Sequence, residues 1–441
     1  MKNSTVAIET LGCKLNQAES ELLVGQFLEA GFRLVGPRDG ADIYILNTCT
    51  VTHIADRKSR HLLRLARRQN PDALVVATGC YAERAPQELA QIGGIDLVIG
   101  NGGKPNLLQA VEGNSTCLSL KGKRISKPVR FRTRSFVKIQ DGCNHFCSYC
   151  IVPSVRGREY SVPMGHVVEE IRARVASGYR EVVLTGINIG TYGQDGAGLR
   201  HLLERILADT GVERLHLSSL QPQDVSPELL SLWRGGRLCR HFHLPLQSGS
   251  ETVLRRMRRR YGLADYHRAV SLLRQAVPGV AVTTDIIVGF PGESDGEFEE
   301  SYQFCREIGF AAMHIFPYSP REGTAAARMP GQVEGRVKKE RGRRMAELAR
   351  SSAHRFRERF LGRTMAVLWE RELAGGVWSG LTDNYLRVFV SSDAPLTDQL
   401  LPVQLVGMHN QGLQGLLVLV PGLCYDATQE GQLTGVGEDD Y

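Results

Sequence analysis

Three cysteines form the most chemically specific pattern in this chain. Cys143, Cys147 and Cys150 follow a C-x3-C-x2-C spacing. Three thiolates at this spacing can hold three irons of a cubane cluster and leave the fourth iron without a protein ligand. That iron could bind a substrate or a cofactor, whereas four-cysteine electron carriers and structural zinc sites close the metal off. A structural zinc or disulfide motif is the alternative, but no second cysteine pair follows to complete a zinc site.

A second set of three cysteines is dispersed in the sequence but shares one position relative to the strands expected around it. Cys13, Cys49 and Cys80 each come one to three residues after a strand-like run. These runs are residues 5–10, 41–46 and 73–78. Ligands of open parallel sheets gather at the carboxyl edge of the strands, so we expect the three thiols to meet there. The alternative is three unrelated core cysteines, because free cysteine is often buried.

The elements around this second set alternate between strand and helix. Helix-period apolar residues fill residues 17–30 and 56–68, between the strand-like runs. A strand–helix–strand order at this pitch is typical of an open parallel sheet. We therefore predict an α/β domain over residues 1–114 that brings Cys13, Cys49 and Cys80 together.

The C-x3-C-x2-C triplet belongs to a longer α/β region between residues 135 and 330. The strand candidates are 136–140, 181–185, 214–218, 241–246, 281–288 and 311–316, and the helices include 166–177, 199–209, 251–259 and 263–276. Six such units are too few for a closed eight-unit barrel, so we predict a partial, open barrel. Its chemistry should lie in loops at the carboxyl ends of the strands, and the triplet follows the first strand.

Two basic segments flank this region. Residues 115–134 contain seven Lys or Arg and no acid, and residues 336–359 contain ten Lys or Arg against three acids. Each segment is either a solvated surface or a contact to nucleic-acid phosphates. Short β-rich pieces after residue 363 predict a small β-barrel. The expected organisation is therefore an N-terminal domain (1–114), a basic linker (115–134), a partial barrel with a basic C-terminal helix (135–361) and a C-terminal β-barrel (363–441).

The composition is that of an ordinary globular protein. Of the 441 residues, 42% are hydrophobic and 23% charged, and the formal net charge of +7 weakly favours an anionic partner. No apolar run approaches the roughly 18 residues needed to cross a bilayer, and residues 1–11 are strand-like and lack the features of a secretory signal. Ten cysteines without an export signal indicate a reducing cytoplasm. We therefore expect a cytoplasmic protein that makes no membrane contact.

Motifs along nearly the whole chain resemble those of the radical S-adenosylmethionine (SAM) methylthiotransferases. They are ETLGCKLN at 9–16, ADIYILNTCT at 41–50, TGCY at 78–81, GCNHFCSYCIVP at 142–153, RGRE at 156–159, LTGIN at 184–188, HLPLQSGS at 243–250 and DIIVGFPGE at 285–293. The resemblance implies a three-cysteine domain, a radical-SAM partial barrel and a C-terminal barrel like the TRAM domain. LGCKLN looks most like the branch that acts on N6-threonylcarbamoyladenosine in tRNA, because the isopentenyladenosine branch typically shows a GCQMN-type motif.

The resemblance also implies two 4Fe-4S clusters, SAM and a reaction. The ligands, catalytic through their clusters, would be Cys143, Cys147 and Cys150 for the SAM-cleaving cluster and Cys13, Cys49 and Cys80 for an auxiliary cluster that delivers sulfur. The product would carry a methylthio group at C2 of an adenine, an unactivated C–H position that requires a cofactor. Isopentenyladenosine or a ribosomal-protein aspartate are alternative substrates, and a non-catalytic metal-containing RNA-binding protein is a remoter alternative.

Three residues near strand ends are candidate SAM contacts. Gly186 would allow close backbone approach, and Gln247 and Asp285 could hold the amino-acid part or the ribose. Each has a structural alternative, as a turn glycine or in hydrogen bonding within the barrel. We interpret His241 and His243, which alternate on one strand, as barrel packing and not as a metal pair.

The expected partners are the tRNA anticodon stem-loop, an electron donor such as flavodoxin or ferredoxin, and an unidentified sulfur donor, with the enzyme acting as a monomer. From residue 363 onward the chain has three Arg, no Lys and ten acids, which makes it a poor phosphate binder. The basic linker and the basic helix should therefore provide much of the RNA affinity. The barrel would add aromatic contacts through Trp369, Trp378 or Tyr385. The cysteines expected to be structural are Cys117, Cys239, Cys305 and Cys424.

Overall fold

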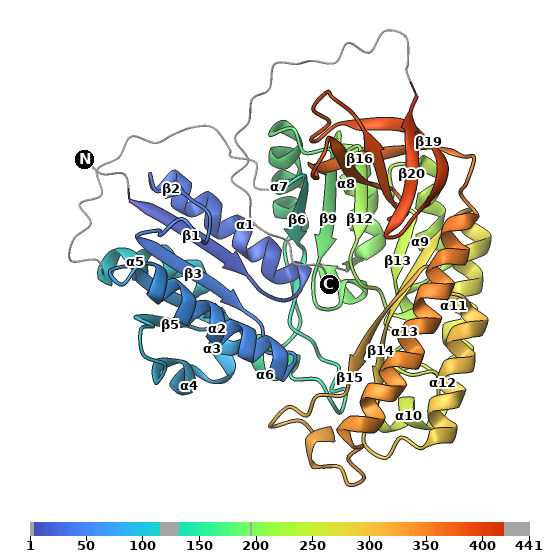
Figure 1. Ribbon diagram of the computed structural model, residues 1–441, viewed down its shortest axis with the longest axis horizontal. Coiled ribbons are helices and arrows are strands. Elements are labelled where there is room, and N and C mark those ends of the chain that lie inside the picture. Colours follow the sequence, from blue (N-terminus) through green and yellow to red (C-terminus); the bar gives the residue numbers. More distant parts are fainter. Residues whose placement is uncertain (1–3, 115–131, 195, 419–441) are drawn as a thin grey trace.

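The computed structural model describes residues 4–114, 132–194 and 196–418. Its first unit is a parallel sheet with strand order β2-β1-β3-β4-β5 (Figure 1). The strands are β1 Thr5–Thr10, β2 Arg33–Leu34, β3 Ile43–Thr48, β4 Leu74–Gly79 and β5 Leu97–Ile99. The helices are α1 Lys14–Glu29 and α5 Leu107–Asn114 on one face, and α2 His53–Gln69, α3 Cys80–Arg84 and α4 Pro86–Ala90 on the other. A 3-10 helix spans Asn101–Asn106.

Apolar side chains on both faces of its strands explain this sheet. Val6 and Ile8 of β1 pack with α1 and α5, whereas Ala7 packs with the helices of the opposite face. Successive residues of a strand point to opposite faces, so a continuous apolar run is typical of a parallel sheet covered on both sides. The open parallel sheet expected from the sequence is confirmed, although β3 ends two residues later than predicted and α1 begins three residues earlier.

The central unit is an open, partial barrel, as predicted. It consists of two parallel sheets, β12-β9-β6 and β13-β14-β15, joined by the isolated bridges Leu215–Leu238 and Ser219–His243. Its strands are β6 Arg134–Lys138, β9 Glu181–Thr185, β12 Arg214–Leu217, β13 His241–His243, β14 Ala281–Val288 and β15 Ala312–Pro317. Its helices are α6 Val152–Arg156, α7 Met164–Ala176, α8 Leu199–Asp209, α9 Pro227–Leu230, α10 Glu251–Arg256, α11 Leu263–Ala276, α12 Asp295–Ile308 and α13 Gly335–Glu358. Small pairings are β7 Gln140–Asp141 with β8 Tyr160–Ser161, and β10 Gly193–Gln194 with β11 Ala197–Gly198.

The two faces of this open barrel differ in chemistry. Val182, Leu184 and Leu215 join the large apolar core beneath the surrounding helices. Residues that alternate with them point to the opposite face. We call that face the polar inner face, because it carries Arg134, Glu181, Arg214, His216, His241, His243, Thr283 and Asp285.

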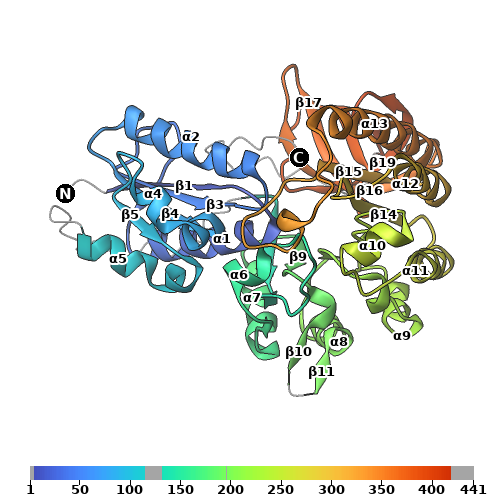
Figure 2. The ribbon, with the colours of Figure 1, turned by 90° about the horizontal axis from the view of Figure 1, so that it is seen from below.

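Helix α1 of the first unit lies against this inner face. Its Ala18 packs on Phe136 of β6 and Val183 of β9, which both alternate with core-facing residues. Glu21 accepts hydrogen bonds from the Ser135 hydroxyl and from the Phe136 backbone N–H, each at 3.2 Å. The first unit therefore covers part of the open side of the barrel, beside β6 (Figures 1 and 2).

The C-terminal unit is a closed barrel with strand order β16-β17-β18-β20-β19, as predicted. Its strands are β16 Thr364–Glu372, β17 Val377–Thr382, β18 Arg387–Ser391, β19 Leu400–His409 and β20 Gly412–Leu417. Trp369 and Trp378 fill its apolar interior and are 0% and 4% exposed, so the expectation that they contact RNA is wrong. Tyr385, between β17 and β18, stacks on His241 of the central unit with ring centres 4.5 Å apart.

Some predicted features lie outside the described residues. They are most of the basic linker, of which only residues 132–134 are described, and Cys117 and Cys424. Arg134 already belongs to β6, so the linker ends earlier than expected. Across residues 4–114, 132–194 and 196–418, no helix combines the length and the apolar character needed to cross a bilayer.

Candidate active site

The dispersed cysteine set, Cys13, Cys49 and Cys80, gathers at the carboxyl edge of its sheet. Cys13, Cys49 and Cys80 follow the adjacent strands β1, β3 and β4, and all three are free thiols. Two glycines with positive φ allow the turns that carry these cysteines to lie close together. A Cβ on Gly12 (φ +101°) would lie 2.9 Å from Cys49 Sγ. A Cβ on Gly79 (φ +94°) would lie 2.5 Å from a carbonyl oxygen of β3. Burial raises the pKa of Cys49 to about 12, so a bound metal would be needed to hold it as a thiolate.

The C-x3-C-x2-C triplet lies in the loop between β7 and α6. The backbone N–H of His145 approaches Cys143 Sγ at 3.3 Å, and Arg259 Nη1 approaches Cys147 Sγ at 3.3 Å. Such donors suit sulfur atoms that carry negative charge. Burial raises the pKa of the third thiol, that of Cys150, to about 12. Arg259 lies 112 residues from Cys147 in the chain, so sequence spacing does not predict this contact.

The donor chemistry of both sets fits cubane clusters with three cysteine ligands each. The thiols are free, and N–H groups approach sulfur in both sets, since Asn101 Nδ2 also lies 3.8 Å from Cys80 Sγ. In the described part of the chain, no three His, Cys, Asp or Glu side chains converge on one metal ion. The thiolates of a cubane bind separate irons and do not require that convergence.

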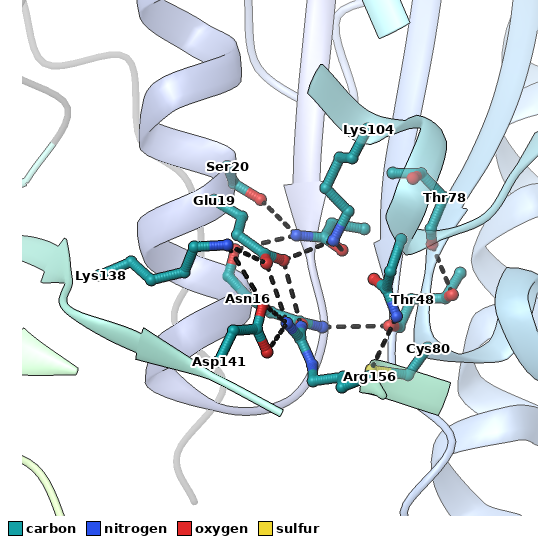
Figure 3. A network of polar contacts seen from close by, with 12 residues as sticks. Asn16, Glu19, Ser20, Thr48, Thr78, Cys80, Lys104, Lys138, Asp141 and Arg156 are labelled. Atoms are coloured by element: carbon teal, nitrogen blue, oxygen red, sulfur yellow. Dashed lines mark hydrogen bonds and ion pairs between the residues drawn. The ribbon is translucent and has the colours of Figure 1, made fainter. Parts of the chain in front are cut away.

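A buried ionic network connects the segments that carry the two cysteine sets (Figure 3). Arg156 ends α6, shortly after Cys150, and its side chain is 1% exposed. It donates to Glu19 Oε1 at 2.9 Å and to Asn16 Oδ1 at 2.5 Å, both in α1, and to Asp141 at 3.1 Å. A single guanidinium thus joins the helix after Cys13 to the loop of the triplet.

The charges in this network favour its ionised form. Burial opposes the ionisation of Glu19, but Lys104 and Arg156 outweigh it and hold the pKa of that carboxyl well below its usual range. Arg156 is also close enough to Cys13 and Cys80 for their charges to interact. It is therefore placed to compensate negative charge on a metal cluster held there.

A second contact fixes the same edge of the first sheet to the central unit. Arg321, in the segment after β15, is 2% exposed. Its Nη2 lies 2.7 Å from Asp56 Oδ2 and 2.8 Å from Thr50 Oγ1, and Thr50 directly follows Cys49. Cys80 itself packs against Ile151 and Val155, just after the triplet. The two cysteine sets therefore border one region of the molecule.

Gly186 directly follows β9 and Gln247 lies four residues after β13, whereas Asp285 lies within β14 and not at its end as expected. A Cβ on Gly186 would lie 2.8 Å from the Gln140 carbonyl oxygen, so packing alone accounts for this glycine. Asp285 lies 3.3 Å from His243 Nε2, within the barrel. Gln247 has φ 69°, uncommon for a residue with a side chain, and its N–H donates to the Asp285 carbonyl at 2.8 Å. Their contact with SAM stays a prediction.

Asn188 is a candidate site residue that sequence reasoning missed. It lies just beyond β9 and is 2% exposed, and neither polar atom of its side chain has a partner among the described residues. A buried amide without a partner costs free energy, which indicates a ligand contact. The sequence contains a signal that could have identified Asn188, because it is the last residue of the LTGIN motif.

The inner face carries a pair of buried imidazoles. His216 Nε2 and His241 Nδ1 are 2.7 Å apart, and burial holds the pKa of both rings well below their usual range, so both are neutral. The packing role predicted for His241 agrees with these contacts, whereas His216 was not singled out. Lys14 reaches the same region: its Nζ lies 5.6 Å from the centre of the Tyr385 ring, and burial lowers its pKa to about 8.

The basic helix α13 offers fewer available charges than its sequence suggests. Arg341 is buried against Glu293 at 2.6 Å. Arg343 pairs with Glu340 and Glu347 on the same helix, and Arg344 pairs with Glu299. These ion pairs reduce the positive charge that α13 could present to RNA.

Two protein-family models match this chain. The Radical SAM superfamily model matches residues 137–305, and the model of uncharacterized protein family UPF0004 matches residues 5–100. The structure of the radical S-adenosylmethionine methyltransferase TsrM from Kitasatospora setae, with cobalamin and a 4Fe-4S cluster bound, covers 74% of this chain and 77% of its own. Its TM-score of 0.51 at 18% identity shows a shared fold.

Two curated relatives extend along nearly the whole chain. The Bacillus subtilis (strain 168) protein named threonylcarbamoyladenosine tRNA methylthiotransferase MtaB is 37% identical, over 99% of this chain and 98% of its own length. The Moorella thermoacetica protein named tRNA-2-methylthio-N(6)-dimethylallyladenosine synthase is 35% identical, over 94% and 98%. The fold and the matching superfamily define a radical-SAM enzyme. The chain belongs, within that class, to the radical-SAM methylthiotransferase family.

Proposed function

We propose that this enzyme methylthiolates C2 of N6-threonylcarbamoyladenosine next to the anticodon of tRNA, giving 2-methylthio-N6-threonylcarbamoyladenosine. The observation that carries the proposal is the Arg156 network, which ties the helix after Cys13 to the loop that contains Cys150. A base held in that region would face both cysteine sets. The Bacillus subtilis relative, whose name states this base, supports the choice of substrate.

The six cysteines would divide the chemistry between them. The triplet Cys143, Cys147 and Cys150 would hold the 4Fe-4S cluster that binds SAM, and the set Cys13, Cys49 and Cys80 would hold a second one. When bound, the clusters and SAM supply the radical and sulfur chemistry that no side-chain acid or base offers at an unactivated C–H bond.

The other residues would bind, orient and balance charge. Arg259 compensates charge at Cys147, and Arg156 does so near Cys13 and Cys80. Asn188 offers an amide without a partner among the described residues to a ligand beyond the carboxyl end of β9, two residues after the candidate SAM contact Gly186.

The RNA would have to present its base unstacked. Loop bases are read by stacking on aromatic side chains and by hydrogen bonds to their edges. Phe146, within the triplet loop, is 55% exposed and lies beneath the Arg158 guanidinium, and Phe316 of β15 is 40% exposed. Either ring could stack on a base. A protein of the flavodoxin or ferredoxin type would supply electrons to the monomeric enzyme.

Nucleoside analysis tests the proposed substrate. In a strain that lacks the gene, mass spectrometry of tRNA nucleosides should show loss of 2-methylthio-N6-threonylcarbamoyladenosine and accumulation of its unthiolated precursor. The wild-type gene should restore the product, and a gene encoding Cys147→Ala should not. The Moorella thermoacetica relative favours isopentenyladenosine as the second candidate. Loss of the methylthio group from that nucleoside alone, or from a ribosomal-protein aspartate alone, would overturn the substrate assignment.

A further inference from the structure

Lys14 is directed at the polar inner face of the open barrel. It is the first residue of α1 and directly follows Cys13. Residues four apart share one face of a helix, and Ala18, four residues later, packs on Phe136 and Val183 of the inner face. The half-buried Lys14 side chain extends from there until its Nζ lies 5.6 Å from the centre of the Tyr385 ring.

The ammonium group of Lys14 has no carboxylate partner within ion-pair distance among the described residues. The nearby acids have other neighbours: Glu181 lies 3.7 Å from Arg214 Nη1, and Asp285 lies 3.3 Å from His243 Nε2. Arg134, the nearby cation, already pairs with Glu370 at 2.7 Å. A partly desolvated charge without a close counter-ion is unfavourable, so this position suits an anionic ligand.

The surroundings of Lys14 also favour an anion. Lys14 stands at the N-terminus of α1, a helix of 16 residues whose dipole places partial positive charge at that end. The inner face is open to solvent along β15, where His314 and Phe316 are exposed. His314 lies beside His243, with ring centres 6.0 Å apart. A substituent could therefore reach the inner face from this side.

We propose that Lys14 binds the carboxylate of the threonylcarbamoyl substituent and thereby selects this adenosine over adenosines with uncharged N6 substituents. The inference rests on the proposed function, because it deepens the recognition of that substrate. The threonyl carboxylate is the only anionic group of the modified base, and an isopentenyl group has none. A lysine ammonium is a compact point charge with three donors and matches such a ligand.

Synthetic anticodon stem-loops test the proposal by binding. Four versions would carry threonylcarbamoyladenosine, its neutral threonine-amide analogue, isopentenyladenosine or unmodified adenosine. The wild-type holoenzyme should bind the carboxylate version about tenfold or more tightly than the amide, as expected for a charge-assisted contact. Lys14→Gln should lose this preference while binding the amide and unmodified stem-loops as the wild type does. Lys14→Arg, which keeps the charge, should restore part of it.

Lys339→Gln serves as the matched control, because Lys339 is an exposed cation on α13. This variant should bind all four stem-loops with affinities reduced by the same factor or unchanged, and it should keep the preference for the carboxylate version. Iron content and thermal unfolding would verify that each variant is folded and loaded. If Lys14→Gln were not folded, equal binding of the carboxylate and amide stem-loops by the wild type would still overturn the proposal.

The outcomes separate this inference from the proposed function. A wild type that modifies threonylcarbamoyladenosine, with an unchanged carboxylate preference in Lys14→Gln, would overturn the role of Lys14 alone. If Lys14→Gln bound SAM more weakly but kept the preference for the carboxylate stem-loop, the Lys14 ammonium would be a SAM contact. That result would also overturn the proposed role of Lys14. A wild type that modifies only isopentenyladenosine would overturn both. Lost carboxylate preference in Lys14→Gln, with partial rescue by arginine, would support the proposal.

Discussion

Individual side chains set the charge around the six cysteines that we propose as iron ligands. The thiols of Cys49 and Cys150 have a pKa of about 12 because they are buried, and thus bind as thiolates only when a metal replaces the proton. Arg259 and Arg156 bring positive charge to the two sets, from distant parts of the sequence. Each set therefore contains a buried thiol with a raised pKa and has a cation nearby that would compensate the charge of a bound cluster.

The roles that we propose for the two sets predict different outcomes for their substitution. In Cys80→Ala, the iron content after anaerobic reconstitution should fall from about eight to about four per chain, because one cluster loses a ligand. Methylthiolation should stop, whereas reductive cleavage of SAM should persist. Iron analysis and detection of 5′-deoxyadenosine by chromatography would measure these changes.

The matched control for that substitution is Cys305→Ala. Cys305 is fully buried in α12 and belongs to the apolar core, away from both sets. This control should retain all iron and lose only the stability that follows from a small cavity, about 1 kcal/mol. Loss of SAM cleavage in Cys80→Ala, with the control intact, would contradict the separation of roles.

At the scale of elements, the turn after β4 depends on a glycine. Gly79 has φ +94°, and a Cβ there would lie 2.5 Å from Asn47 Oδ1 as well as from a β3 carbonyl oxygen. Gly79→Ala should therefore destabilise the protein by at least about 2 kcal/mol, through backbone strain and overlap. It should also displace Cys80 and reduce the iron content. Urea unfolding and iron analysis would measure both effects.

Gly113→Ala provides the comparison for this prediction. Gly113 lies in α5, where no atom would stand within 4 Å of an added Cβ. Alanine favours helix over glycine by about 0.5–1 kcal/mol, so this variant should be slightly stabilised and fully loaded with iron. Equal stability of the two variants would show that the turn at Gly79 tolerates a side chain.

The sequence predicted elements best where apolar runs end at turn residues. The bounds of β9, β14, α8 and α11 agree with the prediction. The prediction for β3 stopped at Leu46, because Asn47 and Thr48 are polar. Both are fully buried, since Asn47 binds Asn16 and Ser20 and Thr48 binds the Thr78 carbonyl. Tertiary hydrogen bonds thus extended a strand beyond its apolar pattern.

At the scale of the whole molecule, the contact between α1 and β6 should depend on pH. Burial raises the pKa of Glu21 from its ordinary value of 4.5 to about 7. The folded protein therefore keeps a proton that the unfolded chain releases. The resulting stabilisation is complete below about pH 4.5 and is lost as the pH rises to about 7, a change of about 3 kcal/mol.

Thermal unfolding of the apoprotein between pH 4.5 and 8 would measure this dependence. Glu21→Gln should flatten it, because glutamine carries no titrating proton. Glu29→Gln changes an exposed glutamate of the same helix and should leave the slope intact. Parallel slopes in the wild type and Glu21→Gln would exclude Glu21 as the group responsible.

The relative placement of the units could not be predicted from the sequence. Motif register indicated that Cys13, Cys49 and Cys80 share an edge, because that edge belongs to one sheet. The ion pairs that join this edge to the central unit link residues far apart in the sequence, such as Arg156 and Glu19, which are 137 positions apart. The periodicity of apolar residues does not indicate that Arg156 and Glu19 pair. In the sequence, each of them is indistinguishable from a charged residue on the surface.

Arg156 restrains the distance between the segments that carry the two cysteine sets. A guanidinium is planar and holds its donors in a fixed fork, whereas an ammonium swivels on a flexible stem. Asn16, Glu19 and Asp141 all accept hydrogen bonds from the Arg156 guanidinium. The rigid guanidinium therefore restrains the distance between α1, which follows Cys13, and the loop that carries the triplet. The spacing of the segments that would border the proposed base is thereby set by contacts that exist without RNA.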